Sequence, residues 1–308
     1  TIPFLRHKSG MASSTTGKDT QWEFINCSFF HYGGVIISSG SDVRMIDCNP
    51  LGPCYIGDND ATAQVTHHTY VSKLHVLRCH EGSVYAKGIR KQVFVDGCTL
   101  SSLMFRPGEE NLITNNNFRS VVGLNYVRSA TNALGTLSQA RIHIDSGDTG
   151  NTDAVIDIKS CRFQPAGLPA SINLVKEYSE CRITDCFFGT TRKESDATAD
   201  TVTIIAGSGG DTVVRTPTVV SGCTFRNSGA TIFESVDIIK DCIVQMENSY
   251  CNTAFVKNTA LDHTDAGNDV DRTILGVTVI DGLDAVFAYS RMSVLFENVV
   301  SLRNARLR

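Results

Sequence analysis

The chain has 308 residues, 42% of them apolar and 19% charged, and its net charge at pH 7 is −4. This apolar fraction excludes an intrinsically disordered chain. The weakly acidic charge, without Lys/Arg runs, argues against nucleic acid as a partner. The sequence has no run of about 18 apolar residues, so we expect no membrane-spanning segment.

The first 20 residues are polar and rich in Ser, Thr and Gly, which predicts a lead-in or cap segment at 1–20. Trp22, the single tryptophan, opens the regular part of the chain and is expected in the core or the cap. The chain starts at Thr1 without a Met, so we expect a fragment or processed form of a longer protein.

From Trp22 onward one short pattern recurs: an apolar residue, two positions, an anchor residue, one position, and often a second apolar residue. The anchor is cysteine in eight copies, at Cys27, Cys48, Cys79, Cys98, Cys161, Cys186, Cys223 and Cys242. Asn116 and Asn298 take the same place in two others, and tight copies are 18 to 21 residues apart. No helix period fits, because the apolar residues alternate or run in fours between Gly, Pro and Asn.

A repeat of roughly 20 residues made of short strands cannot bury its apolar face alone. Coils stacked at about 4.8 Å would pair each strand with the next and build one core. The sequence therefore predicts an all-β solenoid of the single-stranded parallel β-helix type. Stretches at 51–70, 118–140, 189–200 and 262–271 break the repeat and predict inserted loops.

Most of the 11 cysteines share one repeat position, which predicts inward-stacked, reduced side chains rather than a disulfide framework. This expectation fits synthesis in a reducing cytoplasm. No Cys-x-x-Cys pair and no His-Glu-x-x-His spacing occurs, so we expect neither a metal nor another cofactor.

The Asn/Asp/Gly-Cys-x-Phe turns and inserted loops between Trp22 and Arg303 resemble the right-handed parallel β-helix of pectate-lyase-like proteins. They resemble most the β-helical bodies of bacteriophage tailspikes. The resemblance implies a β-helix domain at 21–303 and a short tail at 304–308. It also implies a homotrimer in the virion tail, made in the bacterial host cytoplasm and acting on a bacterial surface polysaccharide. No catalytic motif matches, so the resemblance assigns no catalytic residue.

The first strand of each coil can be aligned between copies, and its last residue is expected to face solvent. Along the chain these residues are Ser38, Lys87, Arg106, Asp145, Glu177, Glu234, Lys257 and Tyr289. Such a column suits an elongated, acidic polysaccharide, because cations hold its charged groups and carboxylates do acid–base work. Lys87, Arg106, Lys257 and Tyr289 are the expected substrate-binding residues.

A glycosidase needs two carboxyls about 5 to 9.5 Å apart. We expect Glu177 to be the general acid, with Asp145 or Glu234 as base or nucleophile. Glu110, Glu180 and Asp237, in the turns after these strands, are second-rank candidates.

Three functions remain open at this point. The first is hydrolysis of a capsule, exopolysaccharide or O-antigen by the carboxylate pair. The second is a polysaccharide lyase on the same fold, in which the Lys, Arg and Tyr residues of the column supply the base and neutralise a uronate carboxyl. The third is a non-catalytic β-helix that binds a receptor or acts as a spacer in a tail fibre.

Overall fold

The chain forms two compact units, Thr1–Ile156 and Asp157–Arg308, and all of its described regular elements are strands. The computed structural model describes residues 5–7, 21–29, 35–37, 40–50, 53–56, 71–86, 89–119, 140–144, 153–164, 170–174, 177–189, 202–208, 214–227, 231–234, 236–246, 252–257, 278–281, 284–287, 293–297, 299–303 and 306–307. Across these ranges we find no helix that is long and apolar enough to span a membrane.

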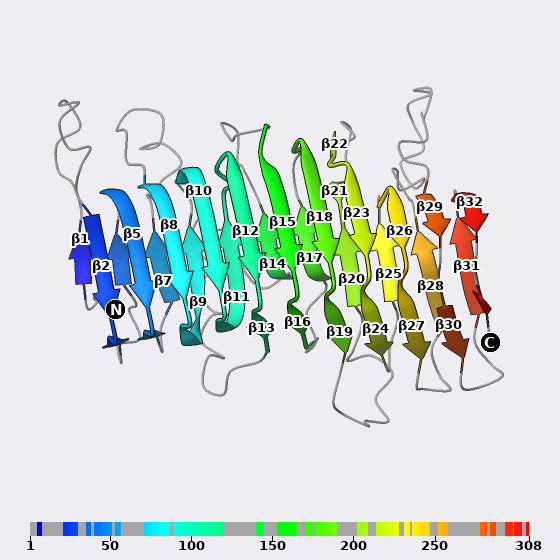
Figure 1. Cartoon of the computed structure of the whole chain (residues 1–308), viewed down its shortest axis with the longest axis horizontal. Coiled ribbons are helices and arrows are strands. Elements are labelled where there is room, and N and C mark those ends of the chain that lie inside the picture. Colours follow the sequence, from blue (N-terminus) through cyan, green and yellow to red (C-terminus); the bar gives the residue numbers. More distant parts are fainter. Residues whose placement is uncertain are drawn as a thin grey trace, which may run out of the picture. The chain divides into compact units, whose positions relative to one another are not determined.

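The first unit contains two main parallel ladders (Figure 1). One consists of β2 (Gln21–Ile25), β5 (Gly40–Ile46), β8 (Val71–Leu77), β10 (Ile89–Asp96) and β12 (Glu110–Thr114). The other consists of β1 (Leu5–His7), β4 (Val35–Ile37), β7 (Pro53–Ile56), β9 (His80–Ala86), β11 (Thr99–Phe105), β13 (Asn117–Phe118) and β14 (Ala140–Ile144). The short strands β3 (Ser28–Phe29) and β6 (Asn49–Pro50) pair with each other, and β15 (Val155–Lys159) runs from this unit into the next.

The second unit contains three parallel ladders, which the chain visits in a fixed order. The first has β18 (Glu180–Thr184), β23 (Thr218–Ser221), β26 (Ile238–Lys240), β29 (Thr278–Asp281) and β32 (Val299–Arg303). The next has β16 (Arg162–Phe163), β19 (Phe187–Gly189), β24 (Thr224–Asn227), β27 (Ile243–Met246), β30 (Asp284–Phe287) and β33 (Arg306–Leu307). The third has β17 (Ala170–Leu174), β20 (Val202–Ile205), β25 (Thr231–Glu234), β28 (Asn252–Lys257) and β31 (Ser293–Glu297). A small antiparallel hairpin, β21 (Gly207–Ser208) and β22 (Val214–Arg215), stands beside them.

These ladders confirm an all-β chain in which successive repeats pair in parallel. The inserted loops predicted at 118–140, 189–200 and 262–271 lie almost entirely outside the described residues. The loop predicted at 51–70 is wrong in part, because it includes β7. Cys54 and Ile56 alternate as buried apolar residues there, and β7 pairs with both β4 and β9. The flanking Gly, Pro and Asp residues hid this short strand in the sequence.

A left-handed residue comes directly before each described anchor and turns the chain from one ladder to the next. Its φ lies between 50° and 64°, at Asn26, Asp47, Arg78, Gly97, Asn115, Ser160, Asp185, Gly222 and Asp241. This conformation costs most residues about 1–2 kcal/mol and suits Gly, Asn and Asp, which explains the composition of the turn. The backbone N–H of Asn26 donates to Ile46 O at 3.0 Å, and the backbone N–H of Asn49 donates to Cys27 O at 2.8 Å. At further turns, the residues directly before and after the anchor make the same two backbone hydrogen bonds to neighbouring repeats. These bonds hold the turns of successive repeats together.

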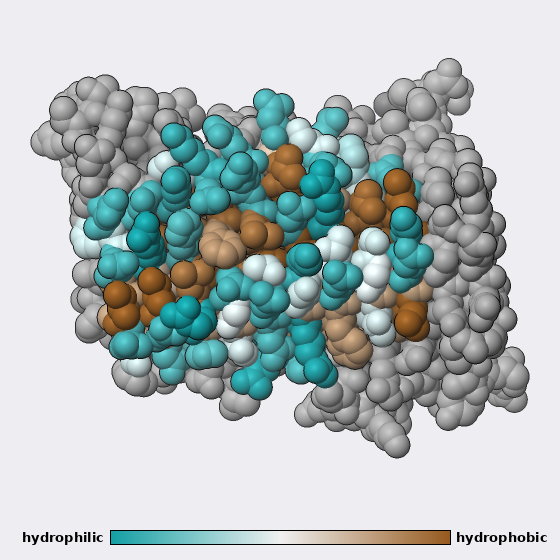
Figure 2. All heavy atoms as spheres, in the orientation of Figure 1, coloured by the Kyte–Doolittle hydropathy of each residue, from teal (hydrophilic) through white to brown (hydrophobic). Residues whose placement is uncertain are grey.

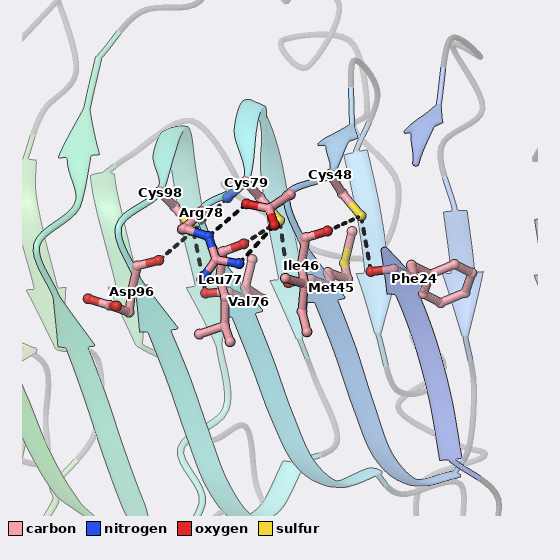
Figure 3. Close-up of polar contacts among 11 residues, drawn as sticks. Phe24, Met45, Ile46, Cys48, Val76, Leu77, Arg78, Cys79, Asp96 and Cys98 are labelled. Carbon is pink, nitrogen blue, oxygen red and sulfur yellow. Dashed lines mark hydrogen bonds and ion pairs between the residues drawn. The ribbon is translucent and has the colours of Figure 1, made fainter. Parts of the chain in front are cut away.

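The anchor side chains fill the inner side of these corners (Figure 3). The Cys98 thiol donates to Asp96 O of its own repeat at 3.3 Å and to Val76 O of the preceding repeat at 3.4 Å. Its sulfur also accepts the amide N–H of Cys79 at 3.3 Å. Ten cysteines of the described residues are free thiols and nine of them are buried, which confirms the predicted inward stacking. Burial raises the pKa of Cys48 to about 11, so this thiol is protonated at neutral pH.

Phenylalanine rings stack in the core of the second unit, one repeat above the other. Phe163 and Phe188 have ring centroids 4.6 Å apart at 6°, and Phe188 and Phe225 have theirs 4.8 Å apart at 5°. All three are fully buried. The apolar residue two positions after the anchor therefore builds a continuous ring column. In the first unit Trp22 stacks on Phe24 and pairs in register with the core residue Val43, in agreement with the core or cap role predicted for it.

Candidate functional site

Three adjacent strands of the first unit, β9, β11 and β14, carry polar side chains on the face opposite to their core residues. Leu103 pairs with Val84 on one side and with Ile142 on the other, and all three are fully buried in the core. Because side chains alternate along a strand, the residues before and after these three point to the opposite face.

That opposite face has two rows of side chains, and both are buried. Ser83, Ser102 and Arg141 make the first row, each directly before a core residue, and they are 1%, 9% and 3% exposed. The second row consists of Tyr85, Met104 and His143, which pair with one another in register. A buried arginine, a histidine, a tyrosine and two serines on one sheet face form an unusual concentration of polar groups, because such groups are rarely buried unless they are bonded.

Hydrogen bonds join several of these groups. The Ser102 hydroxyl donates to Ser83 Oγ at 3.0 Å, and it lies 3.5 Å from the Tyr85 hydroxyl. Arg141 Nη1 donates to Ser101 O at 2.8 Å, which holds the guanidinium along β11. We call Ser83, Ser102, Tyr85 and Arg141 the hydroxyl–arginine cluster.

Burial changes both titratable groups of the cluster in the direction of the neutral form. It raises the pKa of Tyr85, which the nearby serine hydroxyls only partly offset, so the phenol stays protonated at neutral pH. It lowers the pKa of Arg141 to about 10, which still leaves the guanidinium charged at neutral pH. At pH 7 the cluster therefore presents one cation and three neutral hydroxyls.

Arg106 lies at the end of this face, as the sequence predicted. It follows Phe105, its amide donates to Ala86 O at 2.8 Å, and its side chain is partly exposed. Phe105 pairs with both Ala86 and Ile144, so the predicted alignment of these three strands is correct. Lys87 and Asp145 follow Ala86 and Ile144 in the sequence but lie outside the described residues.

The second unit brings Glu234 and Lys257 into register, as the sequence predicted, but leaves Glu177 out of that line. Glu234 pairs with Lys257 on the next strand and with Ile205 on the strand before, and Ile205 pairs with Asn173. Asn173 therefore occupies the place that the sequence alignment gave to Glu177. Glu177 lies farther along the chain, outside the ladder and just before β18, and its side chain is exposed.

This shift has a physical cause. Ile172 and Leu174 are both buried and alternate as core residues, so the strand starts earlier than the apolar run beginning at Leu174 suggested. The side chains of Glu234 and Lys257, and all of Tyr289, lie outside the described residues. The catalytic roles of Glu177, Asp145 and Glu234, and the binding roles of Lys257 and Tyr289, stay predictions.

The second-rank carboxylates make contacts within the fold. Glu180 accepts two hydrogen bonds from Arg182, one of them from Nε at 2.8 Å. Asp237 accepts the amide N–H of Thr218 at 2.7 Å, which ties one repeat to the next. Glu110 lies 3.5 Å from the side-chain amide of Gln92. These contacts favour a role in the structure for these three residues.

The outer face of the β2–β12 ladder is exposed, unlike the polar face of β9, β11 and β14. Figure 2 shows apolar and polar side chains in separate rows over β2, β5 and β8. The apolar row is Ile25, Ile46 and Leu77, which pair in register and of which Ile25 is 51% exposed. Three residues make a patch well below the roughly 300–600 Å² that marks a binding surface. We assign this face no ligand.

A charged pair borders that face and gives a measurable pH effect. Arg78 donates two hydrogen bonds to Asp47, at 2.7 and 2.8 Å, and these bonds are the main cause of a lowered pKa for Asp47. We expect an NMR titration to place this pKa below the ordinary value for aspartate, and to return it to that value in Arg78→Gln. Arg44→Gln, on the neighbouring Glu23–Arg44 pair at 3.9 Å, should leave it unchanged.

The sign of the resulting pH dependence follows from the lowered pKa. The stabilisation from this pair is complete above the unfolded-state pKa of Asp47 and is lost as the pH falls through the folded-state value. Both side chains are well exposed, so the effect on the free energy of unfolding is small. An ordinary pKa for Asp47 in the unmodified protein would contradict the pairing.

Sequence reasoning missed Tyr85, Ser102, Arg141 and His143. It considered only the last residue of each strand, although residues two apart share a face. Applying the alternation backward from Arg106 would have found Met104 and Ser102, and the same step from Asp145 would have found His143 and Arg141.

No group of three or more His, Cys, Asp or Glu residues suited to a metal ion is found within the described ranges. In comparisons with known proteins, neither a family model, nor a curated protein, nor a solved structure matches this chain.

Proposed function

We propose that the chain is a right-handed parallel β-helix that binds and hydrolyses a bacterial surface polysaccharide, as a homotrimeric depolymerase of a phage tail. The observation that carries the proposal is the partly exposed Arg106, at the end of the buried polar face of β9, β11 and β14. The fixed order in which the chain visits its parallel ladders supports the β-helix.

The dimensions of this face suit a polymer. Neighbouring strands lie about 4.8 Å apart, and residues two positions apart on a strand are separated by about 6.6 Å. The hydroxyl, guanidinium and imidazole groups form a regular grid, but they are at most 9% exposed. A saccharide would therefore contact this face at its partly exposed end, Arg106.

Hydrolysis would use a carboxyl pair, for which Asp145 is the candidate in the first unit and Glu177 and Glu234 are the candidates in the second. Asp145 is the carboxylate nearest to this face in sequence, since it directly follows β14. A general acid and a base or nucleophile must flank the scissile bond. The proposal therefore requires a second carboxyl beside Asp145.

A second candidate chemistry is β-elimination, which the partly exposed Arg106 favours. Tyr85 and His143 are 1% and 7% exposed and cannot reach a polymer. The base that removes the proton beside a uronate carboxyl would come from Lys87, Lys257 or Tyr289, and Arg106 would neutralise that carboxyl.

Digestion of purified capsular, O-chain and exopolysaccharide preparations tests the function and separates the two chemistries. New reducing ends without ultraviolet absorbance at the unsaturated uronate band are expected for hydrolysis, with at least a 100-fold loss of rate in Asp145→Asn. Elimination would raise both signals, and the loss would move to Lys87→Gln, Arg106→Gln and Tyr289→Phe. Glu23→Gln, on the other ladder, is the matched control and should keep full activity.

Two further results would contradict the proposal. Binding without cleavage on every preparation would support a receptor-binding or structural β-helix instead. Neither binding nor cleavage would remove polysaccharide as the ligand. Light scattering of the purified chain tests the homotrimer separately.

A further inference from the structure

Asn111 is a buried polar residue at a position that is apolar in the two preceding repeats. It pairs with Val93, which pairs in turn with Leu74, and both of these residues are fully buried in the core. Asn111 is itself 3% exposed. A buried side-chain amide lowers stability unless its polar atoms are hydrogen-bonded. The bonds that Asn111 makes therefore indicate its role.

The Asn111 side chain ties the turn between β11 and β12 to the strand that follows. Its Oδ1 accepts the backbone N–H of Gly108 at 2.9 Å, and its Nδ2 donates to Gly108 O at 3.0 Å. Nδ2 also donates to Val155 O of β15 at 2.9 Å, so both amide hydrogens are used. The backbone N–H of Val155 donates to Glu109 O at 3.1 Å and makes a second link between the turn and β15.

The same turn lies directly against the preceding repeat. A Cβ atom at Gly108 would be 2.6 Å from the carbonyl carbon of Lys91 and 2.8 Å from its oxygen. Both are backbone atoms of β10, which pairs with β8 and β12, so no side chain fits at this position. Gly108 is therefore held between Lys91 of the repeat before it and the bonds from Asn111.

Arg106 lies two residues before this glycine. Its backbone N–H donates to Ala86 O at 2.8 Å, and its partly exposed side chain leaves the turn between the buried residues Phe105 and Pro107. Proline fixes φ at about −65°, so few backbone rotations remain between Arg106 and Gly108. The path by which the Arg106 side chain leaves the turn therefore depends on how firmly Gly108 is held.

We propose that Asn111 is a positioning residue, which acts through Gly108 to hold Arg106 in the orientation that binds the saccharide. This inference rests on the proposed function, in which Arg106 contacts the substrate, and adds the residue that prepares this contact. A group already held in its binding orientation loses less conformational freedom when the ligand binds. Loosening the turn should therefore weaken binding without removing any group that touches the saccharide.

Hydrogen exchange at the backbone N–H of Arg106 tests this role without any ligand. Asn111→Leu introduces the side chain that Leu74 has at the same register, so it keeps the core apolar and removes the three bonds. We expect exchange at Arg106 to become about tenfold faster or more, because the turn that carries it opens more often. Gly108→Ala, which displaces the turn from Lys91, should have the same effect.

Asn116→Ala is the matched control. Asn116 is also buried and also bonds to two backbone groups, at 2.8 and 2.9 Å, but these belong to the anchor Cys98 and to Val95. Its loss should change exchange at Arg106 by less than about twofold, because local opening of one turn leaves another in place. Circular dichroism and urea unfolding establish that each variant is folded. Unchanged exchange at Arg106 in folded Asn111→Leu, or an equal rise in Asn116→Ala, would overturn the positioning role.

A double-mutant cycle with Arg106→Gln gives the functional result, measured on the polysaccharide that the unmodified chain cleaves best. Asn111→Leu alone is expected to raise KM about five- to tenfold and to change kcat less than about twofold, as for a loss of binding. In the Arg106→Gln background it should lower kcat/KM by less than about twofold, because the residue that it positions is gone. Additive losses would overturn the proposal. A chain that cleaves no polysaccharide would remove the proposed function, and the exchange measurement would still decide whether Asn111 holds Arg106.

Discussion

Replacing Phe188 by alanine is expected to lower the free energy of unfolding by about 3–5 kcal/mol. The ring is fully buried and stacks on Phe163 and Phe225, with centroids 4.6 and 4.8 Å away. Removing it leaves a cavity between two rings that β19 and its neighbouring strands hold in place, so the cavity cannot collapse. Urea unfolding followed by circular dichroism measures the loss.

Phe187→Ala is the matched control, on the adjacent residue of the same strand. Its ring is partly exposed and lies under the Arg162 guanidinium at 4.9 Å, a contact worth about 0.5–1 kcal/mol at such a site. Phe188→Leu keeps most of the volume and should cost less than half as much as Phe188→Ala. Equal effects of the two alanine variants would contradict the inward ring column.

Asn116→Ala is expected to cost about 3 kcal/mol, although asparagine is a polar residue in a column of cysteines. Its Oδ1 accepts the amide N–H of Cys98 at 2.8 Å, and its Nδ2 donates to Val95 O at 2.9 Å. Both bonds are buried, and each backbone group left without a partner costs about 1–3 kcal/mol. Denaturant unfolding compared with the unmodified chain gives the value.

Asn116→Cys should recover much of this loss. A cysteine sulfur accepts the preceding anchor amide at Cys79–Cys98 and again at Cys186–Cys223. Asn115→Gly is the exposed control, and we expect a change below about 0.5 kcal/mol, because glycine suits its φ of 55°. A cost of Asn116→Ala no larger than that of the control would show that the anchor amide does not need its partner.

The sequence predicted the corners well because their chemistry is local. A residue suited to left-handed backbone, followed by a small buried anchor, is visible at Asp47–Cys48 and Gly97–Cys98 without any structure. The apolar residue two positions later must then point inward again, as Phe188 does. Parallel pairing of successive repeats follows, because only stacking buries these positions.

The register across irregular stretches could not be predicted in the same way. Around Ile172 the apolar residues alternate over more positions than one strand occupies. Several starting residues for the strand therefore fit the sequence equally well. The pairing of Ile172 with Ile204 decides among them, and it places Asn173 instead of Glu177 in line with Glu234. A strand as short as β7 was likewise hidden between turn residues.

The hydroxyl–arginine cluster could be predicted only in part. Alternation identifies its residues as neighbours on one face. Burial of Arg141 and the hydrogen bond from Ser102 to Ser83 depend on how three strands come together that β10, β12 and β13 separate in the sequence. A sequence pattern shows which residues share a face of a strand, whereas the prediction of a site also requires the register between strands.

The most direct test of the account is a crystal structure of the chain with an oligosaccharide prepared from the surface polysaccharide that it binds best. We expect density for the sugar at the end of the polar face of β9, β11 and β14, in contact with Arg106. Density confined to the outer face of β2, β5 and β8, or none at a saturating concentration, would contradict the assignment of the site.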